Sequence, residues 1–365
     1  MEKNPLPGRR STSLWLPESN KPLIIAGPCS AESPEQLLEV ALRMKQNGAV
    51  SYLRAGIWKP RTTPGNFQGV GSEGLKWLKE VKHETGMPFA TEVGSEKHVY
   101  EALKFGVDMV WIGARTVSNP FVMQEIAEAL RGVDIPVLVK NPLSPDLDLW
   151  EGAIKRLSNV GIRNIGAIHR GFSWWGKSIF RNQPFWKIPM DLKAKFPDLP
   201  VICDPSHISG KRNLVPFVAK RAIDMGFDGL MVEVHPEPEK ALSDAAQQLT
   251  SHEFDLLLTF IDDANFQEQS YPDELLSELR AEVDIMDDLL LWALSNRMEL
   301  SGRIASVKTN RKMSALQPKR WNQVLDRVTN TGEQSGLRAN FIKKLYNAIH
   351  KESLSVQNEL IEKVK

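Results

Sequence analysis

The chain has 365 residues, 42% of them hydrophobic and 25% charged, which is enough for two soluble domains of ordinary size. Its formal net charge of +1 gives no overall field that would attract nucleic acid or an anionic membrane, so we expect neither as a partner. The two cysteines, Cys29 and Cys203, are too few for a disulfide framework and favour a reducing compartment.

Residues 1–21 are rich in proline, serine and charge, and they predict an N-terminal arm without regular structure. This stretch has no apolar segment long enough for a signal peptide. The longest apolar run of the chain, 289–294, is far too short to span a bilayer. We therefore predict a cytoplasmic protein.

From Pro22 onward, short β-branched and apolar runs alternate with amphipathic segments that are typical of helices. The first such helix, 33–48, begins with Ser33 and Gln36 at the spacing of a capping box and ends on a glycine. Eight strand and helix units in succession indicate a parallel sheet, and at this length a closed (β/α)8 TIM barrel over 22–255. The strand candidates are 23–30, 52–57, 89–93, 109–114, 137–141, 165–171, 201–207 and 230–236.

Beyond residue 255 the alternation stops. Residues 256–271 become acidic and polar and are predicted to form a linker. One long helix is predicted from Asp273 to about Lys312, with apolar residues three and four apart in a heptad seam. Such a helix cannot bury its seam alone, so it needs other helices or a second subunit. The seam consists of Leu276, Leu279, Val283, Met286, Leu290, Ala293, Leu300, Ile304 and Val307.

Two further helices are predicted after the long one. The first begins at Pro318, since proline is favoured at the first helical position. A loop over 329–336 is expected to lead into a last helix over 337–363. The pattern predicts an all-α domain of three helices over 272–365.

Metal-binding residue types gather where predicted barrel strands end, and TIM barrels place their active sites at that end. Cys29 closes the first strand, His207 follows the seventh, Glu233 lies in the eighth and Asp244 comes just beyond it. One thiolate, one imidazole and two carboxylates can together hold a divalent metal ion. A lone cysteine can instead be a buried apolar filler, and we favour that interpretation for Cys203.

Basic residues interrupt or directly follow several of the apolar strands, so their charges would converge on one mouth of the barrel. Such a cluster is costly without anions to meet it, and guanidinium groups match phosphate and carboxylate. A solvated charged rim is the alternative for any single residue, but positions inside apolar strands favour a site for small polyanionic substrates. The cluster consists of Arg54, Lys59, Arg61, Arg115, Lys140 and Arg170.

Several sequence motifs follow one another along the barrel segment: AGPCS (26–30), LRAGIWKPRT (53–62), FQGVG (67–71), IGAR (112–115), VICDPSH (201–207) and MVEVHPEPEKALSDAAQQL (231–249). Over about residues 22–255 these motifs resemble those of the type I-beta 3-deoxy-D-arabino-heptulosonate-7-phosphate (DAHP) synthases. That family condenses phosphoenolpyruvate with erythrose 4-phosphate in the first step of the shikimate pathway. A sister family makes the eight-carbon ketodeoxyoctonate phosphate on a similar barrel, but it typically lacks the Lys-Pro-Arg-Thr found at 59–62.

The resemblance implies roles for individual residues. It implies a divalent metal ion, Mn²⁺ first and Fe²⁺, Co²⁺ or Zn²⁺ as alternatives, held by Cys29, His207, Glu233 and Asp244. It implies that phosphoenolpyruvate is surrounded by Arg54, Lys59, Arg115, Lys140 and Arg170. The aldose phosphate would be bound by Lys59, Pro60, Arg61 and Thr62, with Asp204 near its hydroxyl groups. His169 replaces the acidic residue expected before Arg170. Independently of the resemblance, the Lys59 side chain is long enough to serve as general acid or base near the metal.

The helical segment carries charges where its pattern calls for apolar residues. Arg297 falls on the heptad seam, and Lys308 lies about three turns further on the same side. Cations on a buried face need an anionic partner. Ser353 and Gln357 are one turn apart on the last helix. The alternative is a dimerisation module whose charged groups reach solvent.

Residues 272–365 resemble the all-helical chorismate mutases through SELRAEVDIMD, SNRMELSGRIASVK, QPKRW and ESLSVQ. Those enzymes are intertwined dimers that rearrange chorismate to prephenate, and each pocket takes one arginine from the partner chain. The resemblance implies that Lys308 and Gln357 donate to the ether oxygen, whereas Gln317 and Trp321 stand where acidic residues are common. The implied pocket comprises Arg280 from the partner, Arg297, Lys308, Arg320, Ser353 and Gln357.

The combined prediction is a bifunctional homodimeric enzyme in which the helical domain also mediates feedback on the barrel. One alternative is a monofunctional DAHP synthase whose helical domain only dimerises and senses chorismate or prephenate. Another is a non-catalytic barrel that supports an active mutase, although the complete set of ligands and cations argues against it.

Overall fold

A computed structural model describes residues 15–17, 21–60, 63–175, 178–262, 273–311, 313–334 and 336–363. The predicted site residues Arg61 and Thr62 lie outside the described residues, as does most of the predicted linker. Within the helix that starts at Asp273, side chains are described at Arg280, Val283 and Asp287 and from Leu290 onward. The chain divides into two compact units, Met1–Leu275 and Leu276–Lys365.

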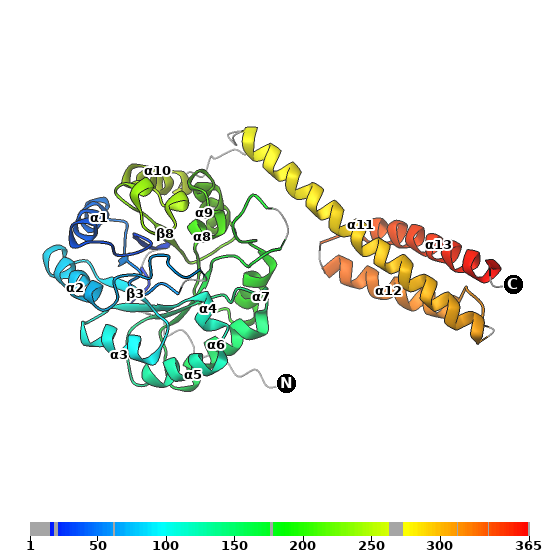
Figure 1. The fold of residues 1–365 in the computed structure, drawn as a ribbon, viewed down its shortest axis with the longest axis horizontal. Coiled ribbons are helices and arrows are strands. Elements are labelled where there is room, and N and C mark those ends of the chain that lie inside the picture. The colour runs from blue at the N-terminus through cyan, green and yellow to red at the C-terminus, as the bar shows by residue number, and fades with distance from the viewer. Residues whose placement is uncertain are drawn as a thin grey trace. The chain divides into compact units, whose positions relative to one another are not determined.

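The first unit is a closed barrel of eight parallel strands, each paired with the next and β8 paired with β1 (Figure 1). This confirms the predicted (β/α)8 fold. The strands are β1 (Leu23–Gly27), β2 (Tyr52–Arg54), β3 (Phe89–Val93), β4 (Met109–Ile112), β5 (Val137–Lys140), β6 (Ile165–His169), β7 (Val201–Cys203) and β8 (Gly229–Glu233).

Helices surround the strands in the barrel unit (Figure 1). Helix α1 begins as predicted, since the Ser33 side chain accepts a hydrogen bond from the Gln36 amide at 3.2 Å, and Gly48 ends it with a φ of +75°. No helix in the described part of the chain is long and apolar enough to cross a membrane. The helices are α1 (Pro34–Asn47), α2 (Glu73–Thr85), α3 (Glu96–Lys104), α4 (Ala114–Val117), α5 (Pro120–Ala129), α6 (Leu147–Asn159), α7 (Lys187–Lys195), α8 (Pro205–Ser209), α9 (Val215–Asp224) and α10 (Ser251–Asp262).

Strand side chains alternate between the barrel interior and the surrounding helices. The inward-facing apolar residues form one buried cluster that includes Trp111 and Ile168. Trp15 joins this cluster and is 7% exposed, so part of the predicted arm packs against the barrel. Helix α10 extends past residue 255, where the barrel was predicted to end, and its Phe254 and Leu257 belong to the main core.

The second unit consists of three helices, as predicted: α11 (Asp273–Asn310), α12 (Pro318–Gln334) and α13 (Ala339–Lys363). The predicted loop over 329–336 is wrong in its first part, because α12 continues through Gln334. Thr329 is buried in this helix and donates its hydroxyl to the Leu325 carbonyl at 2.8 Å. A Cβ at Gly332 would lie 2.3 Å from Ile342, so this glycine allows the close approach of α12 and α13.

The predicted heptad seam of α11 is open within one chain. Its described large members are half or more exposed, among them Val283 at 59%, Leu300 at 52% and Val307 at 52%. Helix α11 meets α13 where Arg297 contacts Ser353. Arg297 lies two turns before Ile304, as the heptad spacing predicts, but it is half-buried because its guanidinium contacts α13.

Candidate active sites

The carboxyl-terminal mouth of the barrel is lined by charged side chains that continue the inward-facing positions. On β5, Lys140 comes two residues after the inward-facing Leu138, and on β8 Glu233 comes two residues after Met231. Because parallel strands end at one rim, this period of two collects the charges in one layer. The layer comprises Arg54, Glu92, Lys140, Arg170, Asp204 and Glu233.

Two of the buried cations in this layer have carboxylate partners. Arg54 Nη1 lies 3.2 Å from Glu233 Oε1, and Lys140 Nζ lies 2.8 Å from Asp204 Oδ2. The buried ring of Trp111 lies close to both cations, 4.9 Å from Arg54 Cζ and 5.9 Å from Lys140 Nζ. Pairing and aromatic contact together offset the cost of burying these charges.

The four residues predicted as metal ligands converge at the same mouth. Ligand atoms of Cys29, Glu233 and Asp244 all lie within 4.8 Å of one another. His207 lies beside them, with Nε2 3.8 Å from Asp244 Oδ2 and Nδ1 3.8 Å from Glu233 Oε1. His207 Nδ1 is also 2.8 Å from Asp204 Oδ2, which orients the ring in the manner common for metal-binding histidines.

The electrostatics of this group fit a divalent cation. Burial, followed by the nearby Glu233 carboxylate, raises the pKa of the Cys29 thiol to about 12. Burial also tends to raise the pKa of Glu233, but His207 and Arg54 outweigh it, so the net pKa is lowered. Glu233 Oε1 is buried and accepts no hydrogen bond from the part of the chain that the structure describes. A soft thiol sulfur together with imidazole and carboxylate donors suits a first-row transition metal ion.

Lys59 lies directly beside Cys29. Its Nζ is 3.3 Å from the sulfur and donates a hydrogen bond to the Cys29 carbonyl. A Cβ at Gly56 would lie 2.4 Å from Lys59 Nζ and 2.9 Å from the Cys29 carbonyl oxygen, so only glycine leaves room for this approach. Pro60 follows and is exposed at the rim.

Arg170 is held rigidly just after β6. Its backbone amide donates to Asn141 Oδ1 at 2.7 Å, and its Nη1 donates to Asn182 Oδ1 at 2.7 Å. Burial lowers the pKa of Arg170 to about 10, so the guanidinium remains charged at neutral pH. Arg115, on α4 after β4, is exposed and close enough to contribute to this lowering. The mouth therefore carries a surplus of positive charge next to the candidate ligands.

Sequence analysis missed a glutamine that joins two candidate ligands. Arg181 Nη1 donates to Asp244 Oδ1 at 3.0 Å and to Gln247 Oε1 at 2.7 Å. Gln247 Nε2 in turn donates to Glu233 Oε2 at 2.7 Å, and the Gln247 side chain is buried. Gln247 and Arg181 together thus link the Glu233 carboxylate to that of Asp244.

The neighbouring Gln248 ties Cys29 to the same loop. It accepts a hydrogen bond from the Cys29 amide at 2.9 Å and donates to the Ser243 carbonyl at 2.8 Å. Asp244 between them adopts a left-handed φ of 51°, an uncommon value for a residue other than glycine. Both glutamines belong to the motif at 231–249. Their contacts depend on the conformation of the loop after β8, which cannot be predicted from the spacing of residues in the sequence.

His169 does not line this mouth. It occupies the outward-facing side of β6, where its ring lies 5.3 Å from Trp186 and 5.7 Å from Phe172 between centroids. Burial and then the nearby Arg170 lower the pKa of His169 to about 3, so the ring is neutral. The departure from the expected acidic residue therefore changes the packing behind Arg170 rather than the site itself.

In the second unit, two cations of α11 meet two polar residues of α13. Arg297 Nη1 donates to Ser353 Oγ, and Lys308 Nζ donates to Gln357 Oε1 at 3.0 Å. Ser353 is 4% exposed and Gln357 7%, whereas both cations are half-buried. The structure thus brings four of the six residues of the predicted pocket together.

The other two residues of that pocket, Arg280 and Arg320, are exposed in the single chain. On α12, Trp321 stacks face to face on His350 of α13, with centroids 3.9 Å apart and planes inclined by 5°. Gln317, at the start of α12, is half-buried. His350 was not considered in the sequence analysis, since a lone histidine on an amphipathic helix gives no signal of its own.

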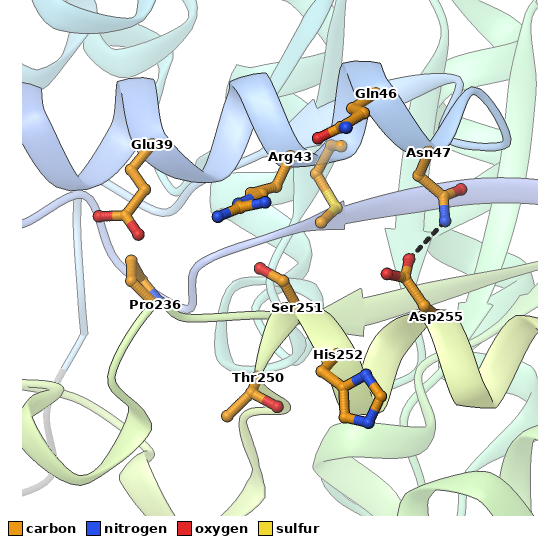
Figure 2. Close-up of a pocket in the computed structure, with 10 residues that line it drawn as sticks. Glu39, Arg43, Gln46, Asn47, Pro236, Thr250, Ser251, His252 and Asp255 are labelled. Carbon is orange, nitrogen blue, oxygen red and sulfur yellow. Dashed lines mark hydrogen bonds between the residues drawn. The ribbon is translucent and has the colours of Figure 1, made fainter.

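A separate surface pocket of about 630 Å³ lies between α1 and α10 on the barrel (Figure 2). Figure 2 shows Glu39 and Arg43 of α1 opposite Ser251 and His252 of α10. None of the residues predicted from the sequence as site residues lines it, and it carries charges of both signs. Its chemistry gives no reason to assign it a ligand.

Two family models match the chain in succession. The model described as the DAHP synthetase I family matches residues 15–267. The model described as chorismate mutase type II matches residues 279–358. The first match covers more than half of the chain, and the two together follow the division into barrel and helices.

Individual relatives agree with the barrel match. A phospho-2-dehydro-3-deoxyheptonate aldolase of Thermotoga maritima is 36% identical over 226 residues, 62% of this chain and 64% of the relative. This chain thus spans less than two thirds of that relative's length. A crystal structure of the DAHP synthase of the same organism superposes with a TM-score of 0.59 at 35% identity, covering 66% of this chain and 67% of that one. A 2-dehydro-3-deoxyphosphooctonate aldolase of Legionella pneumophila is 29% identical over 247 residues, 62% of this chain and 85% of the relative.

Proposed function

Because the chain belongs to the DAHP synthetase I family and continues into a chorismate mutase type II domain, we propose that it is a bifunctional enzyme of the shikimate pathway. The barrel condenses phosphoenolpyruvate with erythrose 4-phosphate to DAHP and phosphate. The helical unit rearranges chorismate to prephenate. The observation that supports the first activity most directly is the convergence of Cys29, His207, Glu233 and Asp244 beside three buried cations.

We infer that these four residues hold a divalent metal ion, Mn²⁺ first and Fe²⁺, Co²⁺ or Zn²⁺ as alternatives. When bound, such an ion supplies Lewis acidity toward the aldehyde oxygen of the sugar phosphate. Arg54 and Gln247 contact the carboxylate of Glu233, and Arg181 contacts that of Asp244, so the ligand set is held in place by its neighbours.

The surplus cations bind and orient the two anionic substrates. Arg54, Lys140 and Arg170 are buried and fixed by hydrogen bonds or ion pairs, and Arg115 lies at the rim. We propose that they grip the phosphate and carboxylate of phosphoenolpyruvate, because rigid cations bring reacting atoms together at little entropic cost. Lys59, beside Cys29, is placed to hold or deliver a proton at the aldehyde oxygen.

The aldose phosphate is proposed to bind at Lys59, Pro60, Arg61 and Thr62, with Asp204 near its hydroxyl groups. This segment favours the four-carbon sugar of DAHP synthesis over the five-carbon sugar needed for an eight-carbon product. The test compares erythrose 4-phosphate with a five-carbon aldose phosphate as the second substrate. Phosphate release from phosphoenolpyruvate is measured with each. A clear preference for the five-carbon substrate would overturn the proposed activity.

For the helical unit, the proposed pocket is formed by Arg297, Lys308, Ser353 and Gln357. The rearrangement is pericyclic and needs no nucleophile, so catalysis consists of holding the dianion in a compact shape and stabilising charge on the ether oxygen. Lys308 and the amide of Gln357 are proposed to donate to that oxygen. The contact between Lys308 and Gln357 at 3.0 Å keeps these two donors together.

We propose a homodimer formed through the helical unit, in which Arg280 enters the pocket of the partner and Arg320 completes the pocket of its own chain. The support is the exposed apolar seam of α11 and the exposure of Arg280 itself. Mixing an Arg280→Ala protein with a Lys308→Ala protein provides the test. A shared pocket predicts that the mixture turns over chorismate although each protein alone does not, and no gain on mixing would contradict it.

We also propose that prephenate or chorismate, bound at the helical unit, inhibits the barrel, because fusion of an early and a late step of one pathway allows such feedback. The protein is proposed to act in the cytoplasm, where its two free cysteines would stay reduced.

The alternative function is a DAHP synthase whose helical unit only dimerises and senses chorismate or prephenate. Chorismate turnover by the intact wild-type protein would exclude that alternative, and inhibition by prephenate without turnover would favour it.

A further inference from the structure

The polar face of α13 extends one turn beyond the residues already assigned to the mutase pocket. His350, Ser353 and Gln357 are spaced by three and four residues, so they lie on one side of the helix. Ser353 and Gln357 each contact a cation of α11. His350 therefore continues the row that faces Arg297 and Lys308.

The imidazole of His350 is fixed in orientation but has one unsatisfied nitrogen. Its ring stacks in parallel on Trp321, with centroids 3.9 Å apart. Its Nε2 is buried and has no hydrogen-bond partner among the residues that the structure describes. A buried polar atom without a partner is costly, and such atoms in native proteins commonly await a ligand or water.

The imidazole of His350 is uncharged, which suits a hydrogen bond with an uncharged group of a ligand. Burial, then Arg297 and Lys308, lower the pKa of His350, so the ring is neutral at pH 7. The same electrostatic contributions place it near both cations. A neutral imidazole nitrogen can exchange a hydrogen bond with a hydroxyl group without adding a third positive charge to the pocket.

We propose that His350 is a substrate-binding residue of the mutase pocket, whose Nε2 hydrogen-bonds the ring hydroxyl group of the dianion held by Arg297 and Lys308. This rests on the proposed mutase function. The cations match the carboxylates, and Lys308 with Gln357 matches the ether oxygen, so the hydroxyl is the polar group left to satisfy. His350 Nε2, beside Trp321, is the buried polar atom of the helical unit that has no partner among the described residues.

The test compares wild type with His350→Leu and His350→Gln in the intact protein. Loss of one hydrogen bond predicts roughly 3- to 10-fold weaker prephenate binding and a higher KM for chorismate in His350→Leu, with partial rescue by glutamine. Thermal unfolding of His350→Leu should be unchanged or shifted upward, because the unpaired nitrogen is removed. Lys351→Met, an exposed substitution on the next residue of α13, is the matched control and should change neither quantity.

Two further measurements separate binding from packing. A dianionic analogue without the hydroxyl group should bind wild type and His350→Leu equally well. Nitrogen NMR of the imidazole, assigned by comparison with His350→Gln, should show an Nε2 shift when prephenate is added. Equal prephenate affinity of wild type and His350→Leu, together with a lowered melting temperature, would overturn the inference and make the stack purely structural. A wild type that neither binds prephenate nor converts chorismate would instead overturn the mutase function itself.

Discussion

The barrel and the helical unit build their charged sites in opposite ways. In the barrel, the charges end the inward-facing rows of the strands, and Arg54 and Glu233 are 1% and 0% exposed. In the helical unit, Arg297 and Lys308 are half-buried and Arg280 is exposed. Strand register fixes the first site within one chain, whereas the second leaves an apolar face of α11 exposed, which the proposed homodimer would cover.

Because of this difference, the two sites should be impaired by different kinds of substitution. A buried ion pair such as that of Arg54 with Glu233 cannot lose one member without leaving an uncompensated charge. In the proposed homodimer, the helical site would instead depend on an apolar contact formed by exposed residues of α11. Changes at that contact should therefore affect the helical site and leave the barrel site unchanged.

Metal removal should separate the sites most strongly. Exhaustive chelation is expected to lower the condensation rate by about 10³-fold or more, because polarisation of the aldehyde is worth several kcal/mol. Chorismate turnover should not change, since the helical chemistry uses no metal. Both rates are measured on one preparation before and after chelation, and restored Mn²⁺ should recover the lost activity. A parallel loss of mutase activity would break the proposed independence.

Ile304→Glu should act on the helical site alone. Ile304 is 50% exposed in the single chain, so the substitution costs little in the monomer but buries a charge in the proposed dimer. Dimer dissociation should become easier by about 100-fold, as expected for a cost of a few kcal/mol. Sedimentation checks this, with chorismate turnover falling in proportion. Ser306→Glu, also exposed on α11, is the control. An equal loss of dimer and of chorismate turnover in Ser306→Glu would contradict the proposal that the seam forms the dimer contact.

Gln247→Leu tests how the barrel site is held together. Loss of the hydrogen bond to Glu233 should weaken metal binding roughly 10- to 100-fold, the usual effect of removing a partner of a ligand. Chelator competition without substrates measures this affinity directly. Gln124→Leu, an exposed change on α5, should leave it unaltered. Unchanged affinity in Gln247→Leu would mean that the glutamine only fills space.

His169 should make the stability of the barrel fall in acid. Its pKa is lowered to about 3 in the folded protein, mainly by burial, whereas the unfolded chain takes up a proton near pH 6.5. Below pH 6.5 protonation therefore favours the unfolded state, by about 1.4 kcal/mol per pH unit until the folded protein also titrates. Urea unfolding of the barrel between pH 7 and 4 measures the slope. His169→Phe should reduce it, and an identical slope would contradict the assignment.

Much of this architecture could be predicted from the sequence, because strands and helices each have a characteristic short-range spacing of apolar residues. Alternating apolar strands predicted the barrel, and charged residues such as Lys140 and Glu233 at their ends predicted the mouth. The three helices followed from their apolar spacing. The error at 329–336 arose because Thr329 and Gly332 are typical of loops. In the helix, Thr329 satisfies its hydroxyl at the Leu325 carbonyl, and Gly332 lets α12 approach Ile342 of α13.

Contacts made by loops or between helices could not be predicted in this way. Arg181 and Asp244 are 63 residues apart in the sequence, and the residues around Arg181 in the sequence give no indication of their contact. Gln247 lies within a recognisable motif, yet its bridge to Glu233 requires the fold of the loop after β8. His350 became significant only when its stacking on Trp321 and its unpaired nitrogen were visible.

The most direct test of two separate catalysts on one chain measures both reactions in wild type, Cys29→Ala and Lys308→Ala. Wild type should consume phosphoenolpyruvate with erythrose 4-phosphate and convert chorismate to prephenate. Cys29→Ala should lose only the condensation, and Lys308→Ala should lose only chorismate turnover, by about 10²- to 10³-fold for a removed donor to the developing charge. A Lys308→Ala protein that still converts chorismate at the wild-type rate, or a wild type that performs only one of the two reactions, would contradict this account.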